Sequence, residues 1–242
     1  MATTENGGRM TVVEHLSELR RRIVISIIAV TLGAIVCFIF SESIIKFLIT
    51  YYRDATAGER DALIFLGPLD AFLTRIKIAT YGGIVLALPV WLFQLWRFIT
   101  PGLNPNEKRY AIPFVFASIV LFAMGAFVAF LTLPKALEFL LDVGGSQLQP
   151  ELTADKYLSF VSLMTVAFGV AFEFPVVLVF LLLARVLTTQ QLRRWRRPAI
   201  VIIVVFAAVI TPSQDPYSLF FMAAPMYIFY EMSIIIGRVL KR

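Results

Sequence analysis

Long apolar runs recur along the chain and limit the folds that it can adopt. Several of them reach the length that crosses the ~30 Å hydrocarbon core of a bilayer as a helix. A membrane β-barrel would instead show alternating strands of about ten residues, and the sequence carries no such pattern. Because 59% of the residues are hydrophobic and only 16% are charged, the composition differs from that of a soluble domain. We therefore expect an all-α, polytopic membrane protein.

The hydrophobicity pattern predicts six transmembrane helices in a single membrane domain. This domain is expected over residues 10–242, after a disordered N-terminus at residues 1–9. The spans are expected at about residues 23–40, 71–98, 110–133, 157–183, 198–211 and 217–237.

Local signals add detail to several of these spans. A helix is expected to begin near Val12 as an amphipathic segment at the membrane surface and to continue into the first span. Gly82 and Pro89 predict a bend or a tilt in the second span. An interfacial helix is expected over residues 43–52, and a long outer loop over about residues 134–156.

The fifth span is shorter than a bilayer is thick. Only about 13 residues separate Pro198 from Pro212, which corresponds to ~20 Å of helix. Such a helix cannot cross ~30 Å of hydrocarbon unaided, so the bilayer should be thinned beside it. We expect both final spans to be short, the sixth less so than the fifth, although Pro225 interrupts it.

Basic residues are distributed unequally between the two sides of the membrane. Fifteen of the 22 Lys and Arg residues fall on the side of the amino terminus, and five fall on the other side. Because basic residues are enriched in cytoplasmic loops, we place both termini in the cytoplasm. The net charge of +6 then reflects these loops, and no nucleic-acid partner is expected.

A carboxylic acid, Glu173, lies inside the fourth apolar run. An ionisable side chain at this depth costs about 3 kcal/mol on insertion scales and normally faces protein or water. Pro175, two residues further on, removes a backbone N–H and predicts a kink in the helix. Glu173 is therefore either a neutral or hydrogen-bonded member of the bundle, or part of a polar cavity within the membrane.

Patterns typical of enzymes and metal sites are missing from the sequence. It contains no His-Glu-x-x-His motif, no Gly-x-Ser-x-Gly motif and no Gly-rich phosphate-binding loop with Lys. One His and one Cys leave no clustered metal site, and Cys37 alone cannot form an internal disulfide. We expect no catalytic activity, no metal and no cofactor.

Acidic residues on the cytoplasmic side are the remaining candidates for a site. Glu14 and Glu18 precede the first span, and Glu107 lies in the first cytoplasmic loop. Glu18 could simply pair with the arginines three and four residues further on, and Glu107 with its basic neighbours. Together, acids on an otherwise basic face would suit a ligand with paired guanidinium groups, because Arg binds carboxylates through two hydrogen bonds.

Four sequence motifs occur in a familiar order. They are His-Leu-x-Glu-Leu-Arg-x-Arg at 15–22, Pro-(x)4-Gln-x-Trp-x-Phe-x-x-Pro-Gly-Leu at 89–103 with Glu-Lys-Arg after it, Phe-Gly-x-x-Phe-Glu-x-Pro at 168–175, and Thr-Pro-Ser-Gln-Asp at 211–215. In this order, over nearly the whole chain, the motifs resemble the TatC family, the multi-spanning subunit of the twin-arginine protein translocase.

The resemblance implies a function and a set of partners. TatC proteins bind the Arg-Arg signal peptides of folded cargo and work with TatA- and TatB-type single-span subunits under a proton-motive force. The chain would then lie in the cytoplasmic (inner) membrane, in a complex that contains further TatC copies.

The resemblance also implies roles for particular residues. The implied signal-peptide-binding residues are Glu18, Arg20, Gln94, Phe98, Glu107 and Arg109. Glu173 would lie on the concave face of a glove-shaped bundle. Thr211, Pro212 and Asp215, with the last two spans, would form the edge where the TatA- and TatB-type partners dock.

A different function remains open for the intramembrane acid. A proton- or ion-coupled small-solute transporter could use Glu173 as its proton carrier. Such transporters often have repeat symmetry and broken helices at matching places, and the two halves of this chain show no convincing match. A receptor for protein export is therefore our leading hypothesis.

Overall fold

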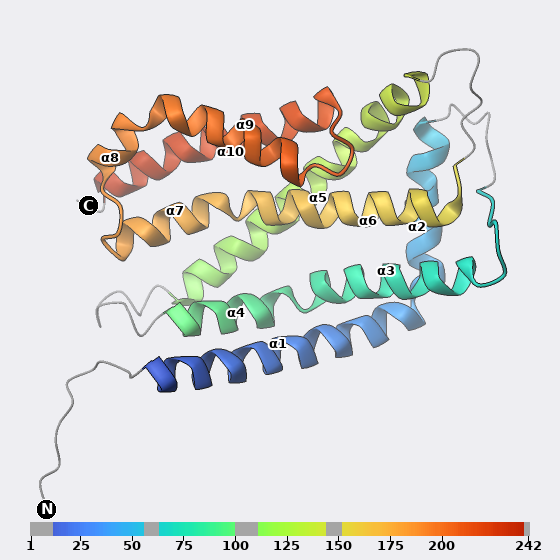
Figure 1. Cartoon of the computed structure of the whole chain (residues 1–242), viewed down its shortest axis with the longest axis horizontal. Coiled ribbons are helices and arrows are strands. Elements are labelled where there is room, and N and C mark those ends of the chain that lie inside the picture. The colour runs from blue at the N-terminus through green and yellow to red at the C-terminus, as the bar shows by residue number, and fades with distance from the viewer. Residues whose placement is uncertain (1–11, 56–62, 100–110, 144–151, 240–242) are drawn as a thin grey trace, which may run out of the picture.

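The chain folds into a helical bundle in which most helices run along one common direction (Figure 1). The computed structural model describes residues 12–55, 63–99, 111–143 and 152–239. In these ranges the helices are α1 (Val12–Ile39), α2 (Ser41–Ala55), α3 (Asp70–Leu86), α4 (Leu88–Ile99), α5 (Ala111–Asp142), α6 (Ala154–Phe172), α7 (Phe174–Leu183), α8 (Thr189–Arg194), α9 (Arg196–Ile210) and α10 (Pro216–Val239). The expected all-α class is confirmed in these ranges, and α1 is helical from Val12, the first described residue.

Several helices are long and apolar enough to cross a membrane. Among the described residues, α1, α5, the α6–α7 segment and α10 each meet this condition, and α3 and α4 meet it together as a pair that is bent by 54°. Helix α9 has 15 residues, or ~22 Å, and is too short to be counted by length. The membrane class is thus confirmed, whereas the count of six requires that α3 and α4 form one span and that α9 crosses the membrane, and it stays a prediction.

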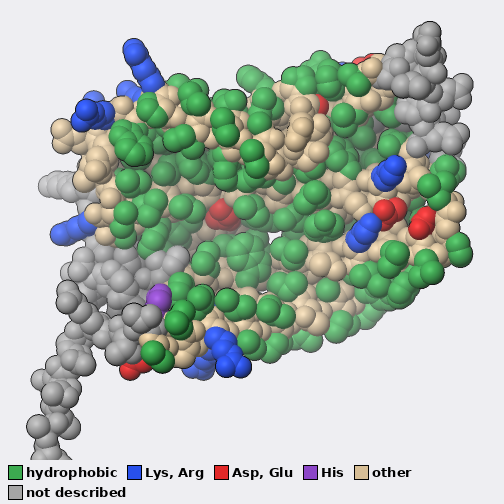
Figure 2. Space-filling model, in the orientation of Figure 1, with side chains coloured by type: hydrophobic (Ala, Val, Ile, Leu, Met, Phe, Trp, Pro, Cys, Tyr) green, Lys and Arg blue, Asp and Glu red, His purple; other side chains and the backbone are tan. Residues whose placement is uncertain are grey.

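The ends of the bundle differ from its middle. Figure 2 shows that charged side chains gather toward the two ends, while hydrophobic side chains cover most of the face between them. Helix α1 begins and helix α10 ends at the same end of the bundle, as an even number of crossings requires (Figure 1). Helix α2 lies across the opposite end, which fits the expected interfacial helix (Figure 1). Which end faces the cytoplasm remains a prediction from the charges.

Two spans are broken near the prolines that predicted a bend. Helix α3 ends at Leu86 and α4 begins at Leu88, so that Pro89 lies in the first turn of α4. Helix α6 ends at Phe172 and α7 begins at Phe174, which leaves Glu173 at the junction. A proline is favourable at the start of a helix, where its missing N–H has no intrahelical partner to lose.

Two expectations about helix length are wrong. Helix α5 continues through Pro134 to Asp142, where an outer loop was expected. The additional turns are stabilised by packing, because Ala136 and Leu137 are 0% and 3% exposed. Helix α10 has 24 residues, or ~36 Å, so the last span is not short, although Pro225 lies inside it.

Glycines allow two pairs of helices to approach closely. A Cβ atom added at Gly83 of α3 would lie 2.6 Å from the backbone nitrogen of Ala34 in α1. A Cβ atom added at Gly169 of α6 would lie 2.5 Å from the ring of Phe122 in α5. Small residues at such contacts let membrane helices pack through van der Waals forces, which must replace the hydrophobic effect within lipid.

Polar contacts hold the end of the bundle that lies opposite the termini. The buried Tyr157 hydroxyl of α6 donates a hydrogen bond to the carbonyl of Leu48 in α2, at 2.7 Å. The Lys77 ammonium of α3 binds both oxygens of Asp155 in α6, at 2.7 and 2.9 Å. These contacts join three helices and fix the scaffold on which α4 and α7 are presented.

Candidate functional site

A polar cluster joins α1 to α4. It lies at the end of the bundle where α1 begins and α10 ends (Figure 1). Arg22 donates from Nη2 to Glu18 Oε1 at 2.6 Å and from Nη1 to Gln94 Oε1 at 2.9 Å. Glu18 and Arg22 lie one turn apart on α1, and Gln94 comes from α4. One guanidinium group is thus held between a carboxylate and an amide, and we call these three residues the guanidinium cluster.

The guanidinium cluster is largely shielded from solvent. The side chains of Arg22 and Glu18 are 15% and 18% exposed, and Gln94 is 9% exposed. An ion pair in such a site interacts more strongly than an exposed pair, because less water screens the charges. Within the described residues, Glu18 Oε2 and Arg22 Nε are buried and have no hydrogen-bond partner. The cluster therefore keeps an unused acceptor and an unused donor.

The surroundings of the guanidinium cluster combine an aromatic stack with a cavity. Phe98 of α4 stacks on His15 of α1, with ring centroids 4.5 Å apart and planes 24° apart. A cavity of about 450 Å³ is lined by Glu14, Ser17, Glu18, Arg21 and Arg22. Carboxylates, guanidinium groups and a hydroxyl thus border a space that is open to a polar, charged ligand.

The structure brings together three of the residues expected to bind a signal peptide. Glu18, Gln94 and Phe98 lie at the contact of α1 with α4. Arg20 is exposed and lies about 200° around α1 from Glu18, so it faces away from this contact.

Three further residues differ from the sequence-based expectation or cannot be placed. Glu107 and Arg109 lie outside the described residues. Arg22 was not expected in the site. Its position four residues after Glu18 predicts an ion pair between the two side chains. Its hydrogen bond to Gln94, 72 positions away, has no signal in the sequence.

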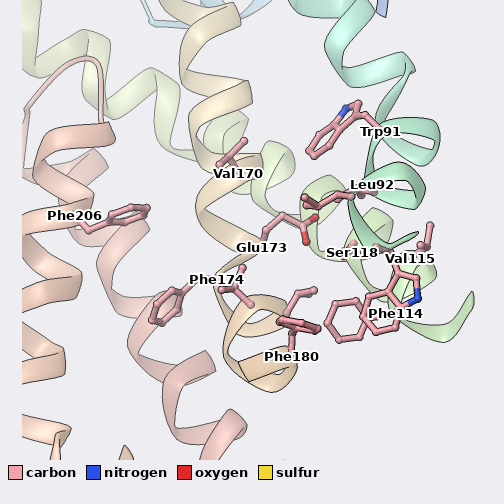
Figure 3. A pocket seen from close by; sticks show the side chains of 14 residues that line it. Trp91, Leu92, Phe114, Val115, Ser118, Val170, Glu173, Phe174, Phe180 and Phe206 are labelled. Atoms are coloured by element: carbon pink, nitrogen blue, oxygen red, sulfur yellow. The ribbon is translucent and has the colours of Figure 1, made fainter. Parts of the chain in front are cut away.

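A second cavity, also of about 450 Å³, surrounds Glu173 in the middle of the bundle (Figure 3). Glu173 is 9% exposed and lies beside Ser118 of α5, toward which its carboxyl group points. Its Oε1 is buried and has no hydrogen-bond partner in the part of the chain that the structure describes. The remaining lining residues are aromatic or aliphatic: Trp91, Leu92, Leu95, Trp96, Phe114, Val115, Val170, Phe174, Val176, Val177, Phe180 and Phe206.

This second cavity differs from the polar cavity that was one expectation. Its walls are apolar apart from Glu173, Ser118 and the two indole groups. Such a cavity suits an apolar segment that carries one group able to bond a carboxyl. Within the described ranges, no group of three or more His, Cys, Asp and Glu residues could hold a metal ion.

The turn between α9 and α10 is built from buried polar side chains. Thr211 and Asp215 are each 1% exposed. The Thr211 hydroxyl donates to the carbonyl of Ala207 at 2.7 Å, and Asp215 accepts from the backbone N–H of Ser218 at 2.8 Å. Asp215 therefore caps α10, with a proline following it at the first helical position. Thr211 and Asp215 shape the turn, and partly buried Pro212 lies between them.

The surface next to this turn is exposed and apolar. On α9, Val201, Val205 and Val209 are 63%, 56% and 77% exposed. A cavity of about 440 Å³ is lined by Val205, Ala208, Val209, Gln214 and Leu219. The buried turn thus positions a short helix whose outer face can contact lipid or another helix.

Comparisons with known proteins agree over almost the whole chain. The family model described as "Sec-independent protein translocase protein (TatC)" matches residues 14–225. A protein of the same description from Frankia casuarinae is 44% identical over 244 residues, which cover 97% of this chain and 67% of that protein. Another from Aquifex aeolicus is 42% identical over 240 residues and covers 96% of this chain and 97% of that protein. A crystal structure of the twin arginine translocase receptor TatC is 42% identical and covers 95% of this chain and 100% of that one, with a TM-score of 0.78.

Proposed function

The chain belongs to the TatC family of Sec-independent protein translocase proteins, and we propose that it is the signal-peptide receptor of a twin-arginine export system. Family membership makes it a membrane subunit of a protein translocase, which is a transport role and not a catalytic one. In the proposed role it binds the Arg-Arg signal peptides of folded cargo and forms a translocation complex with TatA- and TatB-type partners.

The geometry of the guanidinium cluster is the main support for this proposal. Glu18 and Gln94 already hold a guanidinium group, that of Arg22, at hydrogen-bonding distances. The carboxylate and amide oxygens that bind this group are the acceptors that a signal-peptide arginine would need. The adjoining cavity of about 450 Å³ would receive the peptide.

The second arginine of the peptide requires a second acid, and we assign it to Glu107. Helix α4 ends at Ile99, one residue beyond Phe98, and Glu107 follows eight positions later in the chain. The last described residues of α4 therefore lie next to the guanidinium cluster, and Glu107 is close to them in the sequence. In this proposal Phe98 and Arg109 contact the rest of the peptide motif, whereas Arg20 faces away from the guanidinium cluster and is not in this contact.

The apolar stretch of the signal peptide would lie along the cavity that surrounds Glu173. This cavity lies between α4, α5, α6 and α7, and Phe206 of α9 also lines it (Figure 3). Its aromatic and aliphatic walls suit an apolar helix. Glu173 would then provide one polar contact within an otherwise apolar groove.

Partner subunits would dock along α9 and the turn that follows it. The exposed faces of Val201, Val205 and Val209 supply the contact area, while Thr211, Pro212 and Asp215 hold the turn in shape. A 15-residue helix thins the bilayer beside it, and this matches partners whose own spans are short. Both termini would face the cytoplasm, from an inner membrane that also holds further copies of the chain.

The test of this proposal is crosslinking to an Arg-Arg signal peptide. Glu18→Gln and Glu107→Gln should each reduce crosslinking by about 10- to 150-fold, because each removes a charge-assisted hydrogen bond of about 1.5–3 kcal/mol. Glu138→Gln is the matched control, since Glu138 is an exposed acid paired with Lys135 at the other end of the bundle. Unchanged crosslinking in both test variants would contradict the assignment.

A solute transporter is the second candidate function, and the Glu173 carboxyl group within a membrane cavity favours it. Proton flux through the purified chain in vesicles, abolished by Glu173→Gln, would support this candidate. Export of an Arg-Arg reporter, lost when the pair is changed to Lys-Lys, would support the receptor.

A further inference from the structure

Within the guanidinium cluster, Arg22 occupies the acceptor groups of Glu18 and Gln94. Glu18 Oε1 accepts a hydrogen bond of 2.6 Å from Arg22, whose other terminal nitrogen binds Gln94. Arg22 therefore uses two acceptors at once, in the forked arrangement that distinguishes a guanidinium from an ammonium group. A signal-peptide arginine could therefore bind Glu18 only at a position where Arg22 of the receptor is already bound.

The second carboxylate oxygen of Glu18 is not accessible to a ligand either. Glu18 Oε2 is buried and has no hydrogen-bond partner among the described residues. An incoming donor can reach the carboxylate only if the Glu18–Arg22 pair opens or rotates. The side chains are 18% and 15% exposed, so the pair lies near enough to the surface for such an exchange.

We propose that Arg22 is an intramolecular competitor for the signal-peptide arginine: it occupies Glu18 in the empty receptor and is displaced when the peptide binds. This inference rests on the proposed function, because it assumes that Glu18 receives a peptide arginine. The displaced guanidinium remains attached to α1 and can rebind when the peptide leaves. Arg22 thereby lowers the affinity of the receptor and favours release of the peptide.

Competition of this kind has a defined thermodynamic consequence. The apparent dissociation constant equals the intrinsic constant divided by the fraction of receptors whose site is free. This factor is the same for every ligand that needs Glu18. Removing Arg22 should therefore strengthen the binding of Arg-Arg and Lys-Lys peptides equally, and leave the ratio of their affinities unchanged. A residue that instead positioned Glu18 for the peptide would weaken binding when removed.

The experiment measures peptide affinity with the full chain in lipid nanodiscs. The probes are two fluorescent peptides that differ in an Arg-Arg or a Lys-Lys pair, and the readout is fluorescence polarisation. Arg22→Gln should tighten the binding of both peptides about tenfold, equivalent to ~1.4 kcal/mol. Unchanged or weaker binding of the Arg-Arg peptide to this variant overturns the proposal.

A charge-matched variant separates competition from a general change in charge. Arg22→Lys keeps the positive charge but cannot bind two acceptors through a planar fork, so it should tighten binding about threefold. Arg193→Gln removes an exposed arginine of α8 outside the site and should leave affinity within about twofold. If Arg22→Gln does not fold, as a thermal melt would show, Arg22→Lys decides, and unchanged affinity for that variant overturns the proposal.

Failure of the proposed function would look different from failure of this inference. If the wild-type chain does not prefer the Arg-Arg peptide, or if Glu18→Gln binds it equally well, the receptor assignment itself is wrong. If both of these controls behave as expected and Arg22→Gln weakens binding, only the competitor role is wrong.

Discussion

Replacing Glu173 by Leu should make the protein more stable. Glu173 is 9% exposed, and its Oε1 is buried without a hydrogen-bond partner in the described residues. A buried polar group left without a partner costs about 1–3 kcal/mol, and Leu would remove this cost while filling similar space. Apart from Ser118, which lies beside the carboxyl group, the neighbouring side chains are aromatic or aliphatic and would pack against Leu.

The assay is thermal unfolding of the purified chain in detergent. For a protein of this size, 1 kcal/mol shifts the melting temperature by about 2–4 °C, so Glu173→Leu should raise it by about 2–12 °C. The control is Glu138→Leu, which removes an acid whose side chain is 55% exposed and should change stability by no more than about 0.5 kcal/mol.

The outcome also bears on the role of the carboxyl group. A higher melting temperature combined with reduced export would mean that the carboxyl group is kept for function at the expense of stability. A lower melting temperature for Glu173→Leu would refute the reasoning, because the carboxyl group would then have a stabilising partner.

Three other variants test the packing and the turn. Gly83→Ala should destabilise the chain by about 1–3 kcal/mol in the same melting assay, because the new Cβ would lie 2.6 Å from the Ala34 nitrogen; a stable variant would mean that α1 can move away. Tyr157→Phe should cost about 1 kcal/mol, since it removes the buried hydrogen bond from the hydroxyl to the carbonyl of Leu48, and no loss would show that the bond is dispensable. Asp215→Ala should cost about 1–2 kcal/mol through loss of the α10 cap, and should lower copurification of a TatA-type partner; full stability would contradict the capping role.

The sequence predicted much of the helical architecture because its signals are local. A run of apolar residues needs no tertiary partner to be recognised as membrane-spanning, since lipid takes the place of the core. The same locality holds for the breaks at Ala87 and Glu173, each of which lies two residues before a proline. The local signal is misleading at Pro134, where the proline predicts the end of the helix. The helix continues there because the following turn is packed in the core.

The motifs also selected Glu18, Gln94 and Phe98 before their positions were known. What the motifs could not supply is which groups these side chains bind. The spacing of Glu18 and Arg22 predicted an ordinary pair one helical turn apart, open to solvent. In the structure the pair is shielded, and Arg22 also binds Gln94.

The sequence by itself thus determined the membrane class, most of the helix boundaries and the family to which the chain belongs. Only the tertiary structure decided that Arg22 occupies Glu18, that Glu173 lies in an apolar cavity, and that Asp215 is a buried cap. The physical reason is the range of the interactions. Hydrophobicity and proline act within a few residues, whereas the shielding of a charge depends on helices that are distant in the sequence.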